Sequence, residues 1–335
     1  MTNSTQPVPK PAESGRWRTT GVALSRQIAL RGGPFLALLV LIVYLSIASP
    51  FFFSPSNFFS VARQSAVTLI LAVGQTIVII AAGIDLSIGS ILALSGCAAA
   101  LWVTAAHVNV WLAIVGALAL GALLGATNGV VIAIARLPDF IVTLGTLSAF
   151  AGLALISTGG LPVTGLPNEI VWFGNGSLFG IPVAVLVAAI CALGGWFLLE
   201  YTRLGRAIFA MGGNMEAAKV SGINVARQRI AIYAIAGLLA AVASLVMMGR
   251  IQSANAQMGE GLNLDSIAAV VIGGTNLFGG EGTVGGTVIG ALIMGVIANG
   301  MDLLNISAFW QPMMLGTLIV VVVLLDQLRR RRFLS

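Results

Sequence analysis

The sequence predicts an all-α protein, a polytopic transmembrane helical bundle of about ten spans, because apolar residues are abundant and charged residues are scarce. Among its 335 residues, 58% are hydrophobic and 8% are charged, and the mean hydropathy is +1.01. A soluble domain usually carries roughly 25% charged residues, so this chain has too few charges to cover its surface in water. The 41 glycines agree with a bundle in lipid, where small residues let helices approach closely.

Ten stretches are candidate spans, since a helix needs about 20 mostly apolar residues to cross the hydrocarbon core. They are residues 34–52, 64–82, 87–106, 111–135, 140–157, 180–200, 229–249, 264–278, 284–301 and 309–326. The eighth stretch is short, which predicts a partial or broken span. We expect residues 1–33 to form a partly disordered N-terminal segment, residues 34–326 to form the transmembrane domain, and residues 327–335 to form a basic tail.

The basic residues predict the orientation, because cytoplasmic loops carry an excess of Lys and Arg. With the N-terminus inside and ten alternating spans, all of the 17 basic residues except Arg63 and Arg250 lie on the cytoplasmic side. The loop at 158–180 has no basic residue and is rich in turn formers. We therefore expect this loop outside, and both termini and the loop at 201–228 in the cytoplasm.

Residue types argue against several kinds of site. Cys97 and Cys191 lie in apolar runs without paired spacing, and His107 is the only histidine, so we expect no metal site and no disulfide. A phosphate-binding loop needs GxxxxGK followed by Ser or Thr, and the chain has no such string. We therefore expect no cofactor on this chain. The basic residues follow the expected cytoplasmic segments of a protein in membrane lipid, which argues against a nucleic-acid partner.

The loop at 201–228 is too polar to span a membrane and contains a predicted short helix at 214–221 (NMEAAKVS). Asn214 is a suitable N-cap, Glu216 lies in the first turn, and Gly222 is a C-terminal stop. A short helix between glycine-flanked turns is typical of a docking element. A plain connecting loop is the alternative interpretation.

Asp85 lies within residues 82–90 (AGIDLSIGS), which interrupt an apolar region. An acid at membrane depth is costly and indicates either a pathway residue or a structural contact. In one interpretation Asp85 caps the following helix at the inner interface, where Ser87 can also act as a cap. In the other, Asp85 lines a solute path.

Glycines predict two close helix contacts. Gly121, Gly125 and Gly129 are spaced four apart and share one helix face, which favours packing, while the adjacent Asn128 can either bond across helices or face a solute. The glycine-rich stretch at 273–290 predicts a tight cytoplasmic turn and a contact between the eighth and ninth spans. The packing residues expected there include Gly286 and Gly290.

Intramembrane acids are too few for an obvious ion-coupled mechanism. Such carriers often need buried ionisable groups, and only Asp85, Asp265 and Asp302 are candidates, each near a span end. Coupling energy is therefore expected from outside the chain. The competing hypotheses are a self-sufficient, ion-coupled secondary carrier and a membrane scaffold or receptor that transports nothing.

Four strings occur in order and cover most of the chain from about residue 34 to 326: AGIDLSIGS, TRLGRAIFAMGGNMEAAKVSGINV, LDSIAAVVIGGTNLFGGEGTVGGTVIGALI and IANGMDLL. Together they resemble the ribose/xylose/arabinose-type permeases of bacterial ABC importers, the inner-membrane components of binding-protein-dependent transport systems. The resemblance implies the ABC importer permease fold, with both termini in the cytoplasm of a bacterial cell. It also implies that this subunit is not an enzyme.

The resemblance further implies partners. These are a second permease copy or a paralogue, a cytoplasmic ABC ATPase that binds ATP and Mg, and a periplasmic or lipid-anchored sugar-binding protein. The family's coupling loop carries an EAA-like sequence, which Glu216, Ala217, Ala218 and Gly222 match here, after Asn214. One departure is Asn263, since the family often has Glu at this position, two residues before an Asp that is kept here as Asp265.

The mechanism expected from the resemblance is alternating access for a monosaccharide such as ribose or another pentose or hexose. A sugar carries many hydroxyls, so its path is expected to offer sparse hydrogen-bonding side chains. The predicted path residues are Asp85, Ser87, Asn128, Thr143, Thr146, Asn276 and Asn299.

Overall fold

The computed structural model describes residues 16–307, 309–310, 313–314, 316–317, 320–321 and 324. The helices in this part of the chain are α1 (Arg16–Ala48), α2 (Pro55–Ile80), α3 (Ile88–Thr104), α4 (Val110–Ala135), α5 (Asp139–Thr158), α6 (Asn168–Asn175), α7 (Val183–Tyr201), α8 (Arg203–Gly213), α9 (Met215–Val220), α10 (Val225–Ile251), α11 (Leu262–Ile272) and α12 (Val284–Leu303). Strands β1 (Ser177–Leu178) and β2 (Ile181–Pro182) form one antiparallel hairpin. The all-α prediction is therefore confirmed.

Each of the first nine predicted spans coincides with a helix, while most of the tenth, at 309–326, lies outside the described residues. Six helices are long and apolar enough to cross a membrane: α2, α4, α5, α7, α10 and α12. Three further apolar helical segments are shorter than these six: residues Gly32–Ala48 of α1, the whole of α3 and the whole of α11. Helix α11 has 11 residues, or about 16 Å, as expected for a partial span. The count of ten spans stays a prediction.

The N-terminal boundary at residue 33 is not a structural break. Helix α1 begins at Arg16 and continues through Pro34 to Ala48, so at least half of the segment expected before the first span is helical. The predicted disorder of residues 1–15 and the predicted tail at 327–335 lie outside the described residues.

Helices α2 and α10 form the centre of the bundle. In the most apolar window of α2, 78% of the residues are buried, against 22% in α5. Helix α2 packs against α7, α10, α11 and α12, and α10 also packs against α3, α4 and α6. Exposed apolar side chains such as Leu123, Ile156 and Phe197 lie on the outer helices, as expected for a surface in contact with lipid or another subunit.

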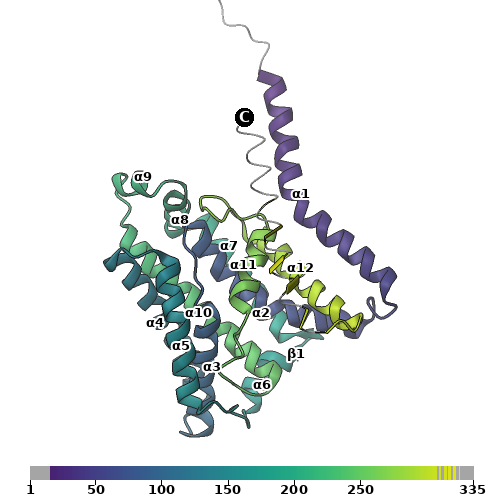
Figure 1. Cartoon of the computed structure of the whole chain (residues 1–335), viewed down its shortest axis with the longest axis vertical. Helices are drawn as coiled ribbons and strands as arrows, with labels where there is room; N and C mark the ends of the chain where they lie inside the picture. Colours follow the sequence, from purple (N-terminus) through teal and green to yellow (C-terminus); the bar gives the residue numbers. More distant parts are fainter. Residues whose placement is uncertain are drawn as a thin grey trace, which may run out of the picture.

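The two ends of the bundle differ (Figure 1). Helices α8 and α9 lie at one end, called the α9 end below, and α6 lies at the other, called the α6 end. Asn175 at the end of α6 donates to the carbonyl of Gly249 at 3.0 Å and so ties α6 to the last turn of α10. Under the predicted orientation, the α9 end is cytoplasmic.

Two non-helical segments enter the bundle. Residues 81–87 join α2 to α3, with Ala82 in the left-handed region at φ +59°. Residues 252–261 join α10 to α11. The second segment reaches the first turn of α3, where a Cβ on Gly89 would lie 2.3 Å from the Gly259 carbonyl oxygen. This contact joins the start of α3 to the segment that leads into α11.

Candidate functional site

The first candidate site is a buried polar cluster around Asp85. Its Oδ1 accepts from the backbone N–H of Ser87 at 2.9 Å and from the Ser87 hydroxyl at 2.7 Å. Asn128 of α4 donates to the same hydroxyl at 2.8 Å, and Gln75 of α2 donates to the Asp85 carbonyl at 3.2 Å. All four residues are fully buried. The cluster therefore joins α2, α4 and the start of α3.

Asp85 holds the start of α3 by accepting from Ser87, and its role in a solute path stays a prediction. Ser87 occupies the N-cap position of α3 but makes no side-chain cap bond; its hydroxyl donates to Asp85 and accepts from Asn128. Among the described residues, Gln75 Oε1, Asp85 Oδ2 and Asn128 Oδ1 are buried acceptors without a partner. The cluster thus retains three buried acceptors without a partner in the part of the chain that the structure describes.

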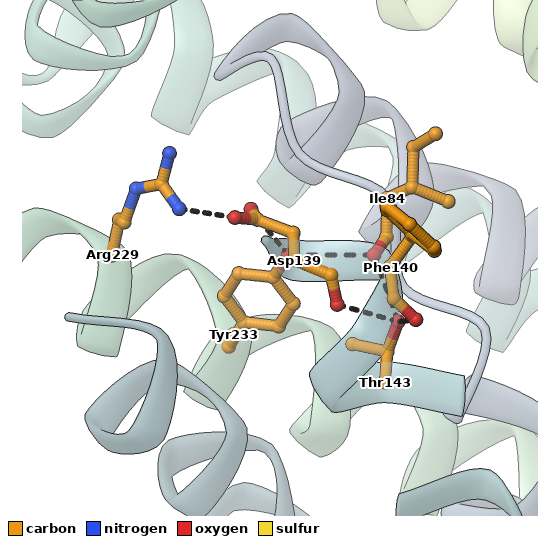
Figure 2. Close-up of polar contacts among 6 residues, drawn as sticks. All are labelled: Ile84, Asp139, Phe140, Thr143, Arg229 and Tyr233. Carbon is orange, nitrogen blue, oxygen red and sulfur yellow. Dashed lines mark hydrogen bonds and ion pairs between the residues drawn. The ribbon is translucent and has the colours of Figure 1, made fainter. Parts of the chain in front are cut away.

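A second cluster lies at the α9 end (Figure 1), next to the first, because Thr143 donates to the carbonyl of Ile84, the residue before Asp85. Figure 2 shows its side chains. Tyr233 of α10 donates to Asp139 Oδ2 at 2.8 Å, and Arg229 pairs with Asp139 Oδ1. Thr143 donates to the carbonyl of Ile84 at 3.1 Å and to that of Asp139 at 2.9 Å. The first turn of α5 is thereby joined to α10 and to residues 81–87.

Sequence reasoning proposed only Thr143 from this second cluster. It missed Asp139, which sits beside a proline at a span boundary, and Tyr233, a phenol inside an apolar span. The spacing of Arg229 and Tyr233 by four residues places both on one helix face. That spacing was the available signal.

The other predicted path residues lie apart from these clusters. Thr146 bonds back to the Val142 carbonyl of its own helix at 3.1 Å. Asn276 orders its own turn, donating to the Gly279 carbonyl at 3.1 Å. Asn299 of α12 exchanges amide hydrogen bonds with Asn57 at the start of α2, at 2.7 and 3.1 Å. The structure therefore groups Asp85, Ser87, Asn128 and Thr143 and does not bring the other three to them.

The predicted packing glycines lie at helix contacts. A Cβ on Gly125 would lie 2.1 Å from the Tyr233 carbonyl oxygen, and one on Gly121 would lie 2.5 Å from that of Gly237. Gly129 meets Ile230 in the same way, with its Cβ position 2.6 Å from the Ile230 Cα. Helices α4 and α10 are thus in direct backbone contact.

The glycines of α12 make a comparable contact with α11. A Cβ on Gly290 would lie 1.8 Å from the Ala269 carbonyl oxygen, and one on Gly286 would lie 2.1 Å from that of Gly273. Side chains at these positions would separate the two helices.

Helix α9 lies where the sequence predicts it. The side chain of Asn214 accepts from the Ala217 N–H at 2.9 Å, and the helix stops before Gly222, whose φ is +86°. Glu216 pairs with Lys219 at 2.6 Å, and both side chains are exposed. Ala218 is buried, so α9 presents its charged face outward and rests on its alanine side.

Helix α8, which the sequence analysis did not predict, supports α9. It is capped by Thr202, whose hydroxyl accepts from the Gly205 N–H at 3.0 Å. The C-terminal end of α8 packs directly against the end of α2, because a Cβ on Gly212 would lie 1.7 Å from the Ile80 carbonyl oxygen. Gly280 donates to that same carbonyl at 2.9 Å. The end of α2, the 273–283 turn and α8 therefore meet directly beside α9.

Metal-ligating residues are sparse. In the described ranges, no group of three or more His, Cys, Asp or Glu side chains could hold a metal ion. Cys97 and Cys191 are both free.

Comparisons with known proteins place the chain in a transport family. The family model described as "branched-chain amino acid transport system / permease component" matches residues 57–323. The ribose import permease protein of Escherichia coli (strain K12) is 44% identical over 317 residues, covering 93% of this chain and 97% of the relative.

Two further relatives are also permeases of sugar transport systems. The ribose import permease protein of Bacillus subtilis (strain 168) is 43% identical, covering 88% of this chain and 92% of the relative. The xylose transport system permease protein of Escherichia coli (strain K12) is 35% identical, covering 84% and 87%. No solved structure matches the chain significantly. With its membrane-length apolar helices, the chain is an integral membrane protein that belongs to this family of transport-system permease components.

Proposed function

We propose that the chain is the transmembrane permease subunit of an ATP-driven ABC importer that carries a monosaccharide, such as ribose or another pentose or hexose, across the bacterial inner membrane. The observation that carries the proposal is the nearly end-to-end similarity to ribose import permeases. Similarity to permeases named for D-allose and xylose supports a sugar substrate but leaves its identity open.

The exposed helix α9 supports coupling to an ATPase. Its cap at Asn214 and its buried Ala218 fix the helix on the bundle, while Glu216 stays exposed. A cytoplasmic ATPase that binds ATP and Mg would press on this helix when its nucleotide-binding domains close. Because α8 and the 273–283 turn touch the end of α2, movement of α9 has a direct mechanical route into the central helix.

The remaining partners follow from the same arrangement. The α6 end would receive a periplasmic or lipid-anchored sugar-binding protein. Exposed apolar faces on the outer helices would contact lipid and a second permease, either identical or a paralogue. The transporter would alternate between outward and inward access as the helices move about their glycine contacts.

The experiment that tests this function is co-purification of the tagged chain, co-expressed with neighbouring gene products, from mild detergent. The wild type is compared with a replacement of residues 214–222 and with Glu216→Lys. Glu200→Lys is the matched control, because it reverses an exposed acid outside α9. We expect an ATPase to co-purify with the wild type and the control, and to be lost from the loop replacement.

Transport assays complete the test. Glu216→Lys should insert normally and fail to couple ATP hydrolysis to sugar uptake. Normal uptake by this variant would contradict the coupling role. If no ATPase is captured and liposomes containing only this chain accumulate solute on an ion gradient, the ion-coupled carrier replaces the ABC permease.

A further inference from the structure

A cavity of about 120 Å³ lies between α2, α10, α11 and α12, near the α6 end. Its polar lining consists of Gln64, Thr68, Arg250 and Asp265, and its apolar lining includes Met247. The volume is several times the roughly 30 Å³ that one water occupies in the liquid. The cavity can therefore hold several waters or a sugar ring in part.

The polar groups of this cavity differ from those of the two clusters described above. In those clusters every named side chain makes at least one hydrogen bond within the protein, as Asp85, Asn128 and Asp139 do. In contrast, the side chains of Gln64, Thr68, Arg250 and Asp265 make no hydrogen bond or close ion pair with any residue in the described ranges. Four unused hydrogen-bonding groups thus converge on one space.

Two of the lining groups carry charges of opposite sign. Asp265 is partly buried and Arg250 is exposed, and both line the cavity without forming an ion pair with one another. The charges of Asp302 and Arg63 also interact electrostatically with Arg250. The lining therefore carries charges of both signs, which suits a neutral ligand with many hydroxyls better than an anion or a cation.

Two arginines lie on the outer side of the membrane in the predicted orientation. Arg63 of α2 and Arg250 of α10 are the only basic residues that the predicted orientation leaves on the outer side. A basic residue on the outer side is disfavoured by the usual distribution of Lys and Arg. A function of Arg250 in the cavity that it lines accounts for this residue.

We infer that this cavity is a binding site for a neutral polyhydroxylated solute, with Gln64, Thr68, Arg250 and Asp265 as its hydrogen-bonding groups. The carboxylate accepts from sugar hydroxyls, the guanidinium donates to them, and Met247 and its apolar neighbours contact the C–H face of the ring. The inference rests on the proposed import of a sugar and assigns that sugar a place within the permease.

The first test is uptake by the complete transporter, with D-ribose, D-xylose and D-allose as probes. Asp265→Asn and Arg250→Gln should each lower uptake about tenfold or more, the loss expected when one hydrogen bond to a charged group is removed. Glu260→Gln is the matched control, because Glu260 is exposed and lies close to Asp265 in sequence without lining the cavity. Capture of the ATPase should be unchanged in all three variants.

The second test measures occupancy directly and does not depend on uptake. Thr68→Cys is labelled with a thiol reagent, with and without each sugar at saturating concentration, in the nucleotide-free and the ATP-trapped complex. We expect a transported sugar to slow labelling of Thr68→Cys and to leave Ser307→Cys, exposed beyond α12, unaffected. Wild-type labelling gives the background from Cys97 and Cys191.

The labelling result decides the inference even where Asp265→Asn or Arg250→Gln fails to fold. Equal labelling of Thr68→Cys with and without a transported sugar, in both nucleotide states, overturns the cavity as a solute site, including when uptake is impaired. Failure of the proposed function itself looks different: no ATPase is captured and no ATP-dependent uptake occurs.

Discussion

The hydroxyl of Tyr233 donates to Asp139 Oδ2 at 2.8 Å, joining two residues that lie 94 positions apart. The same carboxylate accepts from Arg229, one turn earlier on α10. The backbone approaches closely here: a Cβ on Gly83 would lie 2.6 Å from Asp139 Oδ2. This cluster fixes the α9 end of α5 against α10 and the non-helical segment 81–87 (Figure 2). Any opening of the bundle at this end must break it or move it as a unit.

Tyr233→Phe should destabilise the protein by about 0.5–2 kcal/mol, because it removes one hydrogen bond to a buried carboxylate. The measurement is the thermal unfolding midpoint in detergent. Tyr201→Phe, which removes an exposed hydroxyl, is the control and should leave the midpoint unchanged. Equal midpoints for Tyr233→Phe and the wild type would show that the bond contributes nothing to stability.

Gly125→Ala should destabilise the α4–α10 contact by about 1–3 kcal/mol, the usual cost of adding a methyl group to a well-packed interface. Its Cβ would lie 2.1 Å from the Tyr233 carbonyl oxygen. Because that oxygen belongs to the backbone of α10, one of the two helices would have to shift to make room. Gly145→Ala on α5 is the matched control, since nothing lies within 4 Å of its Cβ position. Unfolding midpoints compare the two, and equal effects would argue against backbone packing at Gly125.

The elements that the sequence predicted are those with local signals. Long apolar runs predicted the helices, and Asn214 followed by Glu216 and Gly222 predicted α9. The non-helical entry of residues 252–261 was not predicted, because it depends on contact between Gly89 and Gly259, which are distant in the sequence. No local pattern records such a contact.

The candidate sites show the same limit for a different reason. Path residues were chosen from the sequence because they are polar within apolar runs. In a membrane bundle, however, most such groups bond to neighbouring helices, as Asn299 does to Asn57. Distinguishing a satisfied polar group from a free one requires the partner's position. That is why Gln64 and Thr68 were not singled out.

Asn214→Ala should loosen α9 by about 1 kcal/mol, because it removes the side-chain acceptor for the Ala217 N–H. The global unfolding midpoint should hardly change, since α9 has six residues and is largely exposed. Capture of the ATPase should weaken. Asn224→Ala provides a close control, because it removes the equivalent cap from α10, where Asn224 accepts from the Arg227 N–H at 3.0 Å. Equal capture by both variants would contradict a docking role specific to α9.

The amide pair of Asn57 and Asn299 separates a structural role from a path role for Asn299. Each single Leu substitution leaves the other amide buried without its partner, so each should cost roughly 1–2 kcal/mol. The double variant replaces both polar groups and should cost no more than the larger single loss, a non-additive result in a double-mutant cycle. Unfolding midpoints give the cycle, and sugar uptake by the double variant gives the role. Uptake near wild type in a stable double variant would show that Asn299 only joins α12 to α2. Abolished uptake with the stability cycle intact would instead place Asn299 in the solute path, because the helix contact would then be preserved while a group needed for transport was lost.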